Sequence, residues 1–398
     1  MNNKGEICIG MAGAGRATEL HMNALKRFGG LRICNKHIIA RRSEQVNAAK
    51  ERFNFQRAST NFEDLLNDPE IDVIDICTPP YAHEKMILDA IKADKHVICE
   101  KPLSGYFGVE GENENIGDCV SKSVMFDELI KSLEKIRNEI KYSKRKFMYA
   151  ENFIYAPAVR KAAEIIEKKG SKILFAKGEE SLKGSSSRVA GEWNKTGGGT
   201  FLRTGAHPLS AILWLKQFEA KVRDEKISVE TVLGDMTRMT PKLDEYDHRH
   251  IAARPTDVED FGVAVLTFSD NTKAVVMATD TLLGGSKNYL QLYCNDAVIN
   301  CRLTLSDLME TYFPDEERIA DLYLSEMLPL KTGWNRVALD DEIIRGYADE
   351  MKDFMECIYF DKEPLSGFEI AYDTIKIIYA AYKSAEIGRS VNVKKNQE

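Results

Sequence analysis

The sequence predicts an α/β protein: a doubly wound parallel sheet followed by an α+β domain with a large, mostly antiparallel open sheet. Three observations support this fold class. Apolar strand-like runs alternate with helical patterns through residue 104, and one more strand is expected at residues 146–150. A glycine-rich turn follows the first strand. Beyond residue 151 short strands follow one another as hairpins, with a turn at residues 269–271.

Two domains are therefore expected, residues 1–150 and residues 151–398. A glycine-rich, acidic stretch at about residues 105–127 interrupts the alternating pattern and indicates an insertion. Such an insertion is either a lid or an excursion without a role in the site. Near the C-terminus, two apolar stripes predict helices that are buried in the core or in an interface.

Bulk composition excludes several classes of function. The net charge of −7 over 398 residues argues against nucleic acid as a partner. None of the eight cysteines forms a C-x-x-C pair, which is typical of a reduced protein without a zinc site. The two histidines of residues 248–250 are spaced i, i+2, so a solvated loop or a loop at the substrate rim is expected there and no metal. No apolar run reaches a membrane span, and the first residues lead into a strand, so a cytoplasmic protein is expected.

The glycine-rich turn at residues 13–18 reads G-A-G-R-A-T and connects a strand to a helix. Gly13 permits the tight turn and Gly15 lets the backbone approach a pyrophosphate. Arg16 and Ala17 open the helix, whose N-terminal N–H groups attract phosphate. Thr18 stands where a smaller residue is usual. The turn predicts a dinucleotide site.

The end of the second strand bears on which dinucleotide binds. A preference for NAD usually places Asp or Glu there, but this chain has Ala40 followed by Arg41 and Arg42. Two guanidinium groups suit a 2′-phosphate. The pattern favours NADP(H) and leaves NAD(H) open. The alternative is that these arginines only begin the next helix, at residues 43–53.

Two further strands end in proline motifs, Thr78-Pro79-Pro80 and Glu100-Lys101-Pro102. Ligands of an open parallel sheet bind outside the carboxyl ends of its strands, so both motifs point to the ligand site. Proline also restricts Lys101 before it. A strand that ends in solvated charges is the alternative for the second motif.

A third motif lies in the second half, where residues 197–210 read G-G-G-T-F-L-R-T-G-A-H-P-L-S. If this stretch is helical, Arg203 and His207 share one helix face.

Together, the motifs G-A-G-R-A-T, C-T-P-P-Y-A-H and E-K-P and the 197–210 segment resemble the Gfo/Idh/MocA family of nicotinamide-dependent sugar and polyol oxidoreductases. The resemblance covers nearly the whole chain. It implies that the cofactor contacts Thr78, Pro79, His83 and Glu100, with Lys101 beside the nicotinamide. It also implies a homodimer or homotetramer assembled through the second domain.

The chain departs from the family pattern where aspartates are usual, with Arg203 and Ser210 in their places. Lys101 is then the candidate acid/base, and the charge of Arg203 is expected to favour its neutral form. His207 is expected to relay a proton or orient the substrate, and Arg203 to bind a carboxylate or a hydroxyl array. The candidate catalytic residues are Lys101, His207 and Arg203. The candidate substrate-binding residues are Asn152, Tyr155, Trp193, Arg203 and His207, with core packing as the alternative for Trp193.

The resemblance implies an enzyme that interconverts a secondary alcohol and a carbonyl on a sugar, cyclitol or related polyol by hydride transfer. Two alternatives stay open. One is an NAD-dependent glycosidase that acts by transient oxidation and elimination. The other is a dinucleotide-binding sensor in which Arg203 has abolished the chemistry.

Overall fold

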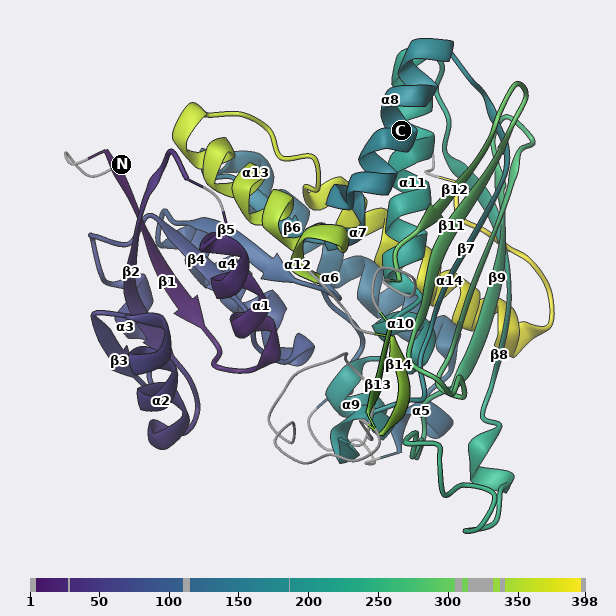
Figure 1. Cartoon of the computed structure of the whole chain (residues 1–398), viewed down its shortest axis with the longest axis horizontal. Coiled ribbons are helices and arrows are strands. Elements are labelled where there is room, and N and C mark those ends of the chain that lie inside the picture. The colour runs from purple at the N-terminus through teal and green to yellow at the C-terminus, as the bar shows by residue number, and fades with distance from the viewer. Residues whose placement is uncertain are drawn as a thin grey trace.

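The computed structural model describes the chain in seven stretches (Figure 1): residues 5–27, 29–109, 115–185, 187–304, 310–313, 332–336 and 341–394. Two sheets organise it, and helices fill the space between them. The predicted fold class is confirmed.

The first sheet is parallel throughout and has the strand order β3-β2-β1-β4-β5-β6. Its strands are β1 (Glu6–Ala12), β2 (Arg32–Ile39), β3 (Arg57–Ser59), β4 (Val73–Ile76), β5 (His96–Glu100) and β6 (Phe147–Ala150). The connecting helices are α1 (Arg16–Leu25), α2 (Ser43–Phe53), α3 (Glu63–Leu66), α4 (His83–Lys92), which follows the single turn η1 (Pro80–Ala82), and α6 (Lys122–Tyr142). The order reverses between β1 and β4, and ligands of such sheets bind at that reversal.

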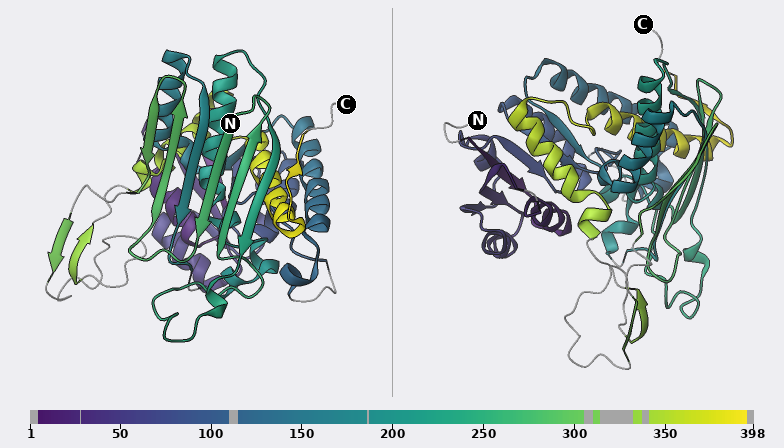
Figure 2. Two further views of the ribbon diagram at one scale, coloured as in Figure 1. Left: turned by 90° about the vertical axis from the view of Figure 1, so that its right-hand side faces the viewer. Right: turned by 45° about the horizontal axis from the view of Figure 1, so that its top comes forward.

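The second sheet has the order β12-β11-β7-β10-β9-β8-β15 and is antiparallel except for the β7–β10 pair. Its strands are β7 (Ile173–Ser181), β8 (Val229–Thr237), β9 (Phe261–Phe268), β10 (Lys273–Thr279), β11 (Lys287–Cys294), β12 (Val298–Arg302) and β15 (Val391–Asn392). Figure 2 shows one face of this sheet bare of helices. The strands β13 (Glu310–Phe313) and β14 (Gly333–Arg336) pair antiparallel in a separate two-stranded sheet.

Helices from the second half cover the inner face of this sheet. They are α8 (Pro157–Lys169), α11 (Ala206–Val222) and α14 (Phe368–Ile387). Shorter pieces complete the chain: α5 (Ile116–Cys119), α7 (Asn152–Tyr155), η2 (Arg188–Gly191), α9 (Trp193–Thr196), α10 (Thr200–Arg203), η3 (Thr240–Lys242) and α12 (Asp341–Ile344). Every second residue of β9 is buried, which is what a sheet with one covered face requires. Among the described residues, no helix is long and apolar enough to cross a membrane.

The last part of the chain returns to the first sheet. Helix α13 (Tyr347–Phe360) packs against α1, and its predicted apolar stripe is buried there. Met351 and Phe354 of this stripe are fully enclosed. The sequence predicted that the stripe is buried, but not that it lies against a helix more than 300 residues earlier in the chain.

The predicted insertion lies partly outside the described residues, which omit 110–114. Its described start packs inside the molecule, because the Tyr106 backbone N–H donates to the Tyr379 hydroxyl over 2.6 Å. The insertion therefore begins as part of the core.

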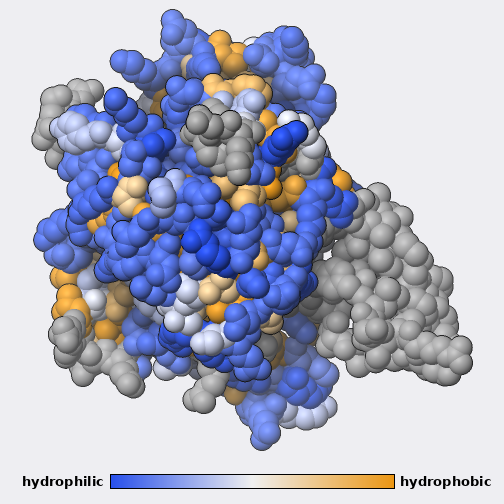
Figure 3. Space-filling model, turned by 90° about the vertical axis from the view of Figure 1, so that its left-hand side faces the viewer, coloured by the Kyte–Doolittle hydropathy of each residue, from blue (hydrophilic) through white to orange (hydrophobic). Residues whose placement is uncertain are grey.

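The face formed around α2 and α3 is covered mainly by hydrophilic side chains (Figure 3).

Candidate active site

A cavity of about 730 Å³ opens at the carboxyl ends of β1, β2 and β4. We call it the large cavity. It brings together these predicted cofactor residues: Gly13, Gly15, Arg41, Arg42, Thr78 and Pro79. Three motifs that are far apart in the sequence therefore line one wall, as parallel strands that end at the same edge require.

The glycine turn fits a phosphate group. Gly13 has φ +120°, and a Cβ there would lie 2.4 Å from the carbonyl oxygen of Cys77, so only glycine is accommodated. Gly15 precedes α1, and no side chain caps the start of that helix. Backbone N–H groups and the positive end of the helix dipole are thus available to an anion.

Both arginines lie on the exposed rim of the large cavity. No aspartate or glutamate stands among the described residues that line it. With Lys195, the described lining of this cavity therefore carries three cations and no described acid. That distribution suits an additional phosphate better than a neutral ribose hydroxyl.

A second cavity, of about 270 Å³, lies on the other side of the start of α1, and we call it the lysine cavity. Its lining residues include Arg16, Ala17, Glu100, Lys101, Thr204 and His207. The first turn of α1 thus separates the two cavities, with Gly15 on one side and Arg16 on the other. An extended ligand that crosses this helix end would contact both.

Lys101 joins the two halves of the molecule. Its Nζ donates a hydrogen bond over 2.8 Å to the backbone carbonyl oxygen of Arg203, at the end of α10. An ammonium group has three donors, so two remain for a ligand. The bond directs the lysine from the carboxyl end of β5 into the space beside the second sheet.

His207 reaches the lysine cavity from the first turn of α11. Its Nδ1 lies 2.6 Å from Oε1 of Glu151, and its ring stacks on Phe153 with 4.8 Å between centroids. Glu151 is fully buried. A carboxylate accepts only, so Nδ1 carries the hydrogen and Nε2 is left as an acceptor. The sequence analysis missed Glu151, although it directly follows β6 at the sheet edge where ligands bind.

A buried charged chain lies beneath Lys101. Nδ1 of His21 is 2.9 Å from Asp75, and Nε2 is 3.3 Å from Glu100. Burial disfavours the charged imidazole, but the charge interactions and hydrogen bonds with Asp75 and Cys77 together outweigh burial and hold the pKa of His21 well above its usual value. Burial likewise opposes the charged form of Glu100, but hydrogen bonding to His21 lowers the pKa of that carboxyl. Oε2 of Glu100 accepts from the backbone N–H of Lys101 over 2.9 Å, so the chain ends at the lysine.

His21 and Asp75 were not predicted. Each stands in an element that the sequence marks only as structural, His21 within α1 and Asp75 inside the apolar strand β4. A charged residue inside an otherwise apolar strand was the available signal.

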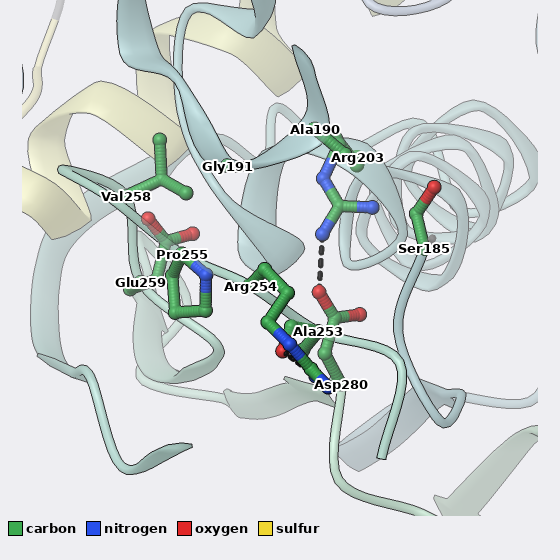
Figure 4. Close-up of a pocket in the computed structure, with 10 residues that line it drawn as sticks. All are labelled: Ser185, Ala190, Gly191, Arg203, Ala253, Arg254, Pro255, Val258, Glu259 and Asp280. Carbon is green, nitrogen blue, oxygen red and sulfur yellow. Dashed lines mark hydrogen bonds and ion pairs between the residues drawn. The ribbon is translucent and has the colours of Figure 1, made fainter. Parts of the chain in front are cut away.

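The guanidinium of Arg203 does not face Lys101. Figure 4 shows it directed to Asp280, with which it forms an ion pair, in a pocket shared with Arg254 and Glu259. Asp280 is 4% exposed and supplies the opposite charge that a half-buried guanidinium requires. Only the backbone carbonyl of Arg203 reaches Lys101, which differs from the expectation that its charge acts on the lysine.

Four other predicted residues are buried and line neither cavity. Asn152 donates to the carbonyl oxygen of Arg345 over 2.8 Å, and Tyr155 donates to Asp353 over 2.8 Å. Trp193 donates to the Tyr106 carbonyl oxygen over 3.1 Å. The ring nitrogens of His83 each lie 2.9 Å from a carbonyl oxygen, of Thr78 and Pro102. These side chains support the loops that form the cavities.

Glu259 holds the segment that presents the Arg203 carbonyl. Its carboxylate accepts from the backbone N–H groups of Gly199 and Phe201, each over 2.9 Å, and from the Tyr382 hydroxyl over 2.8 Å. Burial nonetheless raises the pKa of Glu259 to about 7. The glycine run is therefore anchored by a carboxyl group that titrates near neutrality.

This anchoring predicts a pH dependence of stability. The folded pKa of Glu259 lies above that of the unfolded chain, so its contribution is complete below the unfolded pKa and is lost as pH rises through about 7. We expect the thermal midpoint of Glu259→Gln to fall less than that of the wild type between about pH 5 and about pH 8. The exposed Glu245→Gln serves as control and keeps the wild-type profile. An identical profile for Glu259→Gln would contradict the assignment.

Residues 7–124 match the Gfo/Idh/MocA family, described as an oxidoreductase family with an NAD-binding Rossmann fold. The uncharacterized oxidoreductase YrbE of Bacillus subtilis is 35% identical over 99 residues, which are 25% of this chain and 28% of that protein. Myo-inositol 2-dehydrogenase of Thermotoga maritima is 31% identical over 96 residues, 24% of this chain and 28% of that protein. These matches thus span less than a third of either relative.

Solved structures match over the whole chain. GenD2 from gentamicin A biosynthesis, in complex with NAD, superposes with a TM-score of 0.77 at 18% identity, covering 98% of this chain and 97% of that one. Levoglucosan dehydrogenase, in complex with NADH and levoglucosan, has a TM-score of 0.71 at 20% identity, covering 98% and 100%. At such identities the match shows a shared two-sheet fold. Residues 7–124 of this chain are therefore similar to the NAD-binding Rossmann fold of the Gfo/Idh/MocA oxidoreductase family, and the chain shares its two-sheet fold with these solved structures.

Proposed function

We propose that this protein is a nicotinamide-dependent oxidoreductase that interconverts a secondary alcohol and a carbonyl on a sugar, cyclitol or related polyol. One observation carries the proposal. Lys101 and His207, which pairs with the buried Glu151, line one cavity, immediately across the start of α1 from a phosphate-fitting glycine turn. The ligands in the names of the similar proteins, levoglucosan and myo-inositol, are of the same substrate class.

The two cavities suit the two ends of a dinucleotide. Gly13, Gly15 and the start of α1 would hold the pyrophosphate, and Arg41 and Arg42 would bind a 2′-phosphate at the rim of the large cavity. This assignment favours NADP(H) over NAD(H). When bound, the nicotinamide supplies or accepts the hydride.

Proton transfer is assigned to Lys101. The Arg203 carbonyl fixes the position of Nζ, so the ammonium can give its proton to the reacting oxygen in reduction and the amine can take it back in oxidation. His207 relays this proton through Nε2, and the buried Glu151 carboxylate stabilises the imidazolium that forms. Asp280, by pairing with Arg203, keeps the guanidinium away from the reacting centre.

The open face of the second sheet supports assembly into a homodimer or homotetramer. Its outward positions include Val263 and Val265 on β9 and Val275 and Met277 on β10, and all four are partly exposed. An apolar sheet face without a helix over it is typical of an interface. We expect Val265→Lys combined with Met277→Lys to lower the mass measured by light scattering to that of a monomer. A wild-type monomer would contradict the proposal.

Lys101→Ala tests the acid/base assignment. We expect kcat to fall by about a thousandfold with bound cofactor retained, because the reacting oxygen loses its proton donor and acceptor. Lys85→Ala, on the exposed face of α4, is the matched control and keeps full activity. Steady-state kinetics with myo-inositol and levoglucosan measures this. Full activity of Lys101→Ala would exclude the lysine, and product without net change in the cofactor would favour the transient-oxidation glycosidase.

The cofactor preference is tested by Arg41→Ala combined with Arg42→Ala. Loss of two charge-assisted contacts should weaken NADP(H) binding by about tenfold to a hundredfold and leave NAD(H) binding nearly unchanged. Fluorescence titration of both reduced cofactors measures the two affinities. Equal weakening of both would refute the 2′-phosphate assignment.

A further inference from the structure

One wall of the lysine cavity holds a carboxylate that neither the fold nor the proposed proton relay uses. Glu180 on β7 is 3% exposed, and its Oε2 has no hydrogen-bond partner among the described residues. The distance from Oε2 to Nε2 of His207 is 3.9 Å, too long for a hydrogen bond. A buried acceptor without a donor is costly, so a ligand that supplies a donor there gains affinity.

Asn288 provides a second such acceptor beside the first. It stands directly opposite Glu180 in the β7–β11 pairing, so the two side chains lie on the same face of the sheet. Asn288 is also 3% exposed, lines the same cavity, and has no hydrogen-bond partner for Oδ1 within the described part of the chain. Two neighbouring acceptor atoms in the lysine cavity, Oε2 of Glu180 and Oδ1 of Asn288, therefore have no donor among the described residues.

Arg345 approaches this pair from the segment between α12 and α13. Its Nη2 lies 3.5 Å from Oε1 of Glu180 and balances that charge. Its backbone is held in place: the Asn152 amide bonds its carbonyl oxygen, and a Cβ on the following Gly346 would lie 2.2 Å from the Asn152 carbonyl oxygen. The charge of Glu180 is therefore compensated although its Oε2 is unsatisfied.

The charges around the cavity decide which donor fits. An ammonium group would add a cation beside Lys101 and Arg345, while Glu100 is already engaged by His21. A carboxylate would face the unsatisfied oxygen of Glu180. A neutral hydroxyl donates without either repulsion.

We propose that Glu180, Asn288 and Arg345 form a hydroxyl-binding subsite that selects a neutral polyol with adjacent hydroxyl groups. One hydroxyl is the reacting group at Lys101 and His207, and its neighbour donates to Glu180 and Asn288. Nε2 of His207 and Oε2 of Glu180 lie 3.9 Å apart, so the two acceptors are close enough to contact two hydroxyl groups of one small molecule. The subsite rests on the proposed function and narrows its substrate class: amino sugars and sugar acids are disfavoured.

Calorimetric titration of the cofactor-saturated protein tests this without requiring turnover. The probes are myo-inositol, levoglucosan, D-glucose, D-glucosamine and D-glucuronate, of which the last three share one ring. We expect the wild type to bind its best neutral polyol at least about tenfold more tightly than D-glucosamine or D-glucuronate. Glu180→Gln should weaken binding of that polyol by about tenfold to a hundredfold. It should also strengthen binding of D-glucuronate relative to D-glucose, because it removes the Glu180 carboxylate, which would repel an anionic sugar.

Adjacent glutamates on β7 offer a matched control. Glu179→Gln alters the neighbouring residue, which points to the opposite face of the sheet and pairs with Lys287, and it should bind all five probes as the wild type does. If Glu180→Gln does not fold, Asn288→Ala carries the same expected loss. In kinetic assays the loss should lie mainly in KM, whereas a general disturbance of the fold would lower kcat as well.

Three results would overturn the subsite: wild-type affinity in the variants of Glu180 and Asn288, equal affinity for charged and neutral sugars, or no binding of any probe. The proposed function fails differently. Polyols that bind in a Glu180-dependent manner without turnover would refute the oxidoreductase and keep the subsite. Polyols that are oxidised equally by the wild type and Glu180→Gln would support the oxidoreductase and refute the subsite.

Discussion

A hydrogen bond from Nζ of Lys101 to the carbonyl oxygen of Arg203 joins the two halves of this candidate active site. The lysine comes from the carboxyl end of a parallel strand, and its acceptor ends a short helix beside the second sheet. Neither half alone encloses the lysine cavity. Buried groups hold both partners of this bond. Glu100, which pairs with His21, accepts from the backbone N–H of Lys101, and Glu259 accepts from the glycine run that leads to Arg203. A backbone acceptor also makes the contact independent of the side chain at residue 203.

That independence means that the contact tolerates Arg203 at a position where the family pattern that the sequence resembles has aspartate. The guanidinium turns to Asp280, and the carboxylate that supports the histidine comes instead from Glu151. The charge on the imidazole side is thus preserved by a residue elsewhere in the chain. In a buried site the position of a charge matters more than the sequence position of the residue that carries it, because a low dielectric makes an uncompensated charge costly.

The two cavities also differ in the charged side chains that line them. The large cavity has arginines on its rim and no described acid in its lining, whereas the lysine cavity mixes Lys101 and Arg345 with Glu100 and Glu180. The first suits a polyanion and the second a neutral molecule rich in hydroxyl groups. The start of α1 stands between them and directs its backbone N–H groups at the junction. This division would suit a ligand whose phosphate groups lie in the large cavity, with a small polar co-substrate in the lysine cavity.

The sequence by itself predicted the fold class and the residues Gly13, Gly15, Thr78, Lys101 and His207, which the structure places in the lining of the two cavities. These follow from local rules: periodicity, the conformation of glycine, and the geometry of strand ends. Only the tertiary structure decided the partners of those residues. Glu151, Glu180, Asn288 and Arg345 occupy unremarked positions, and His21 and Asp75 are hidden in structural elements. Arg203 faces away from the lysine because Asp280, 77 residues later, lies within its reach. Contacts between residues that are distant in the sequence depend on how the two sheets pack, and no local pattern records that packing.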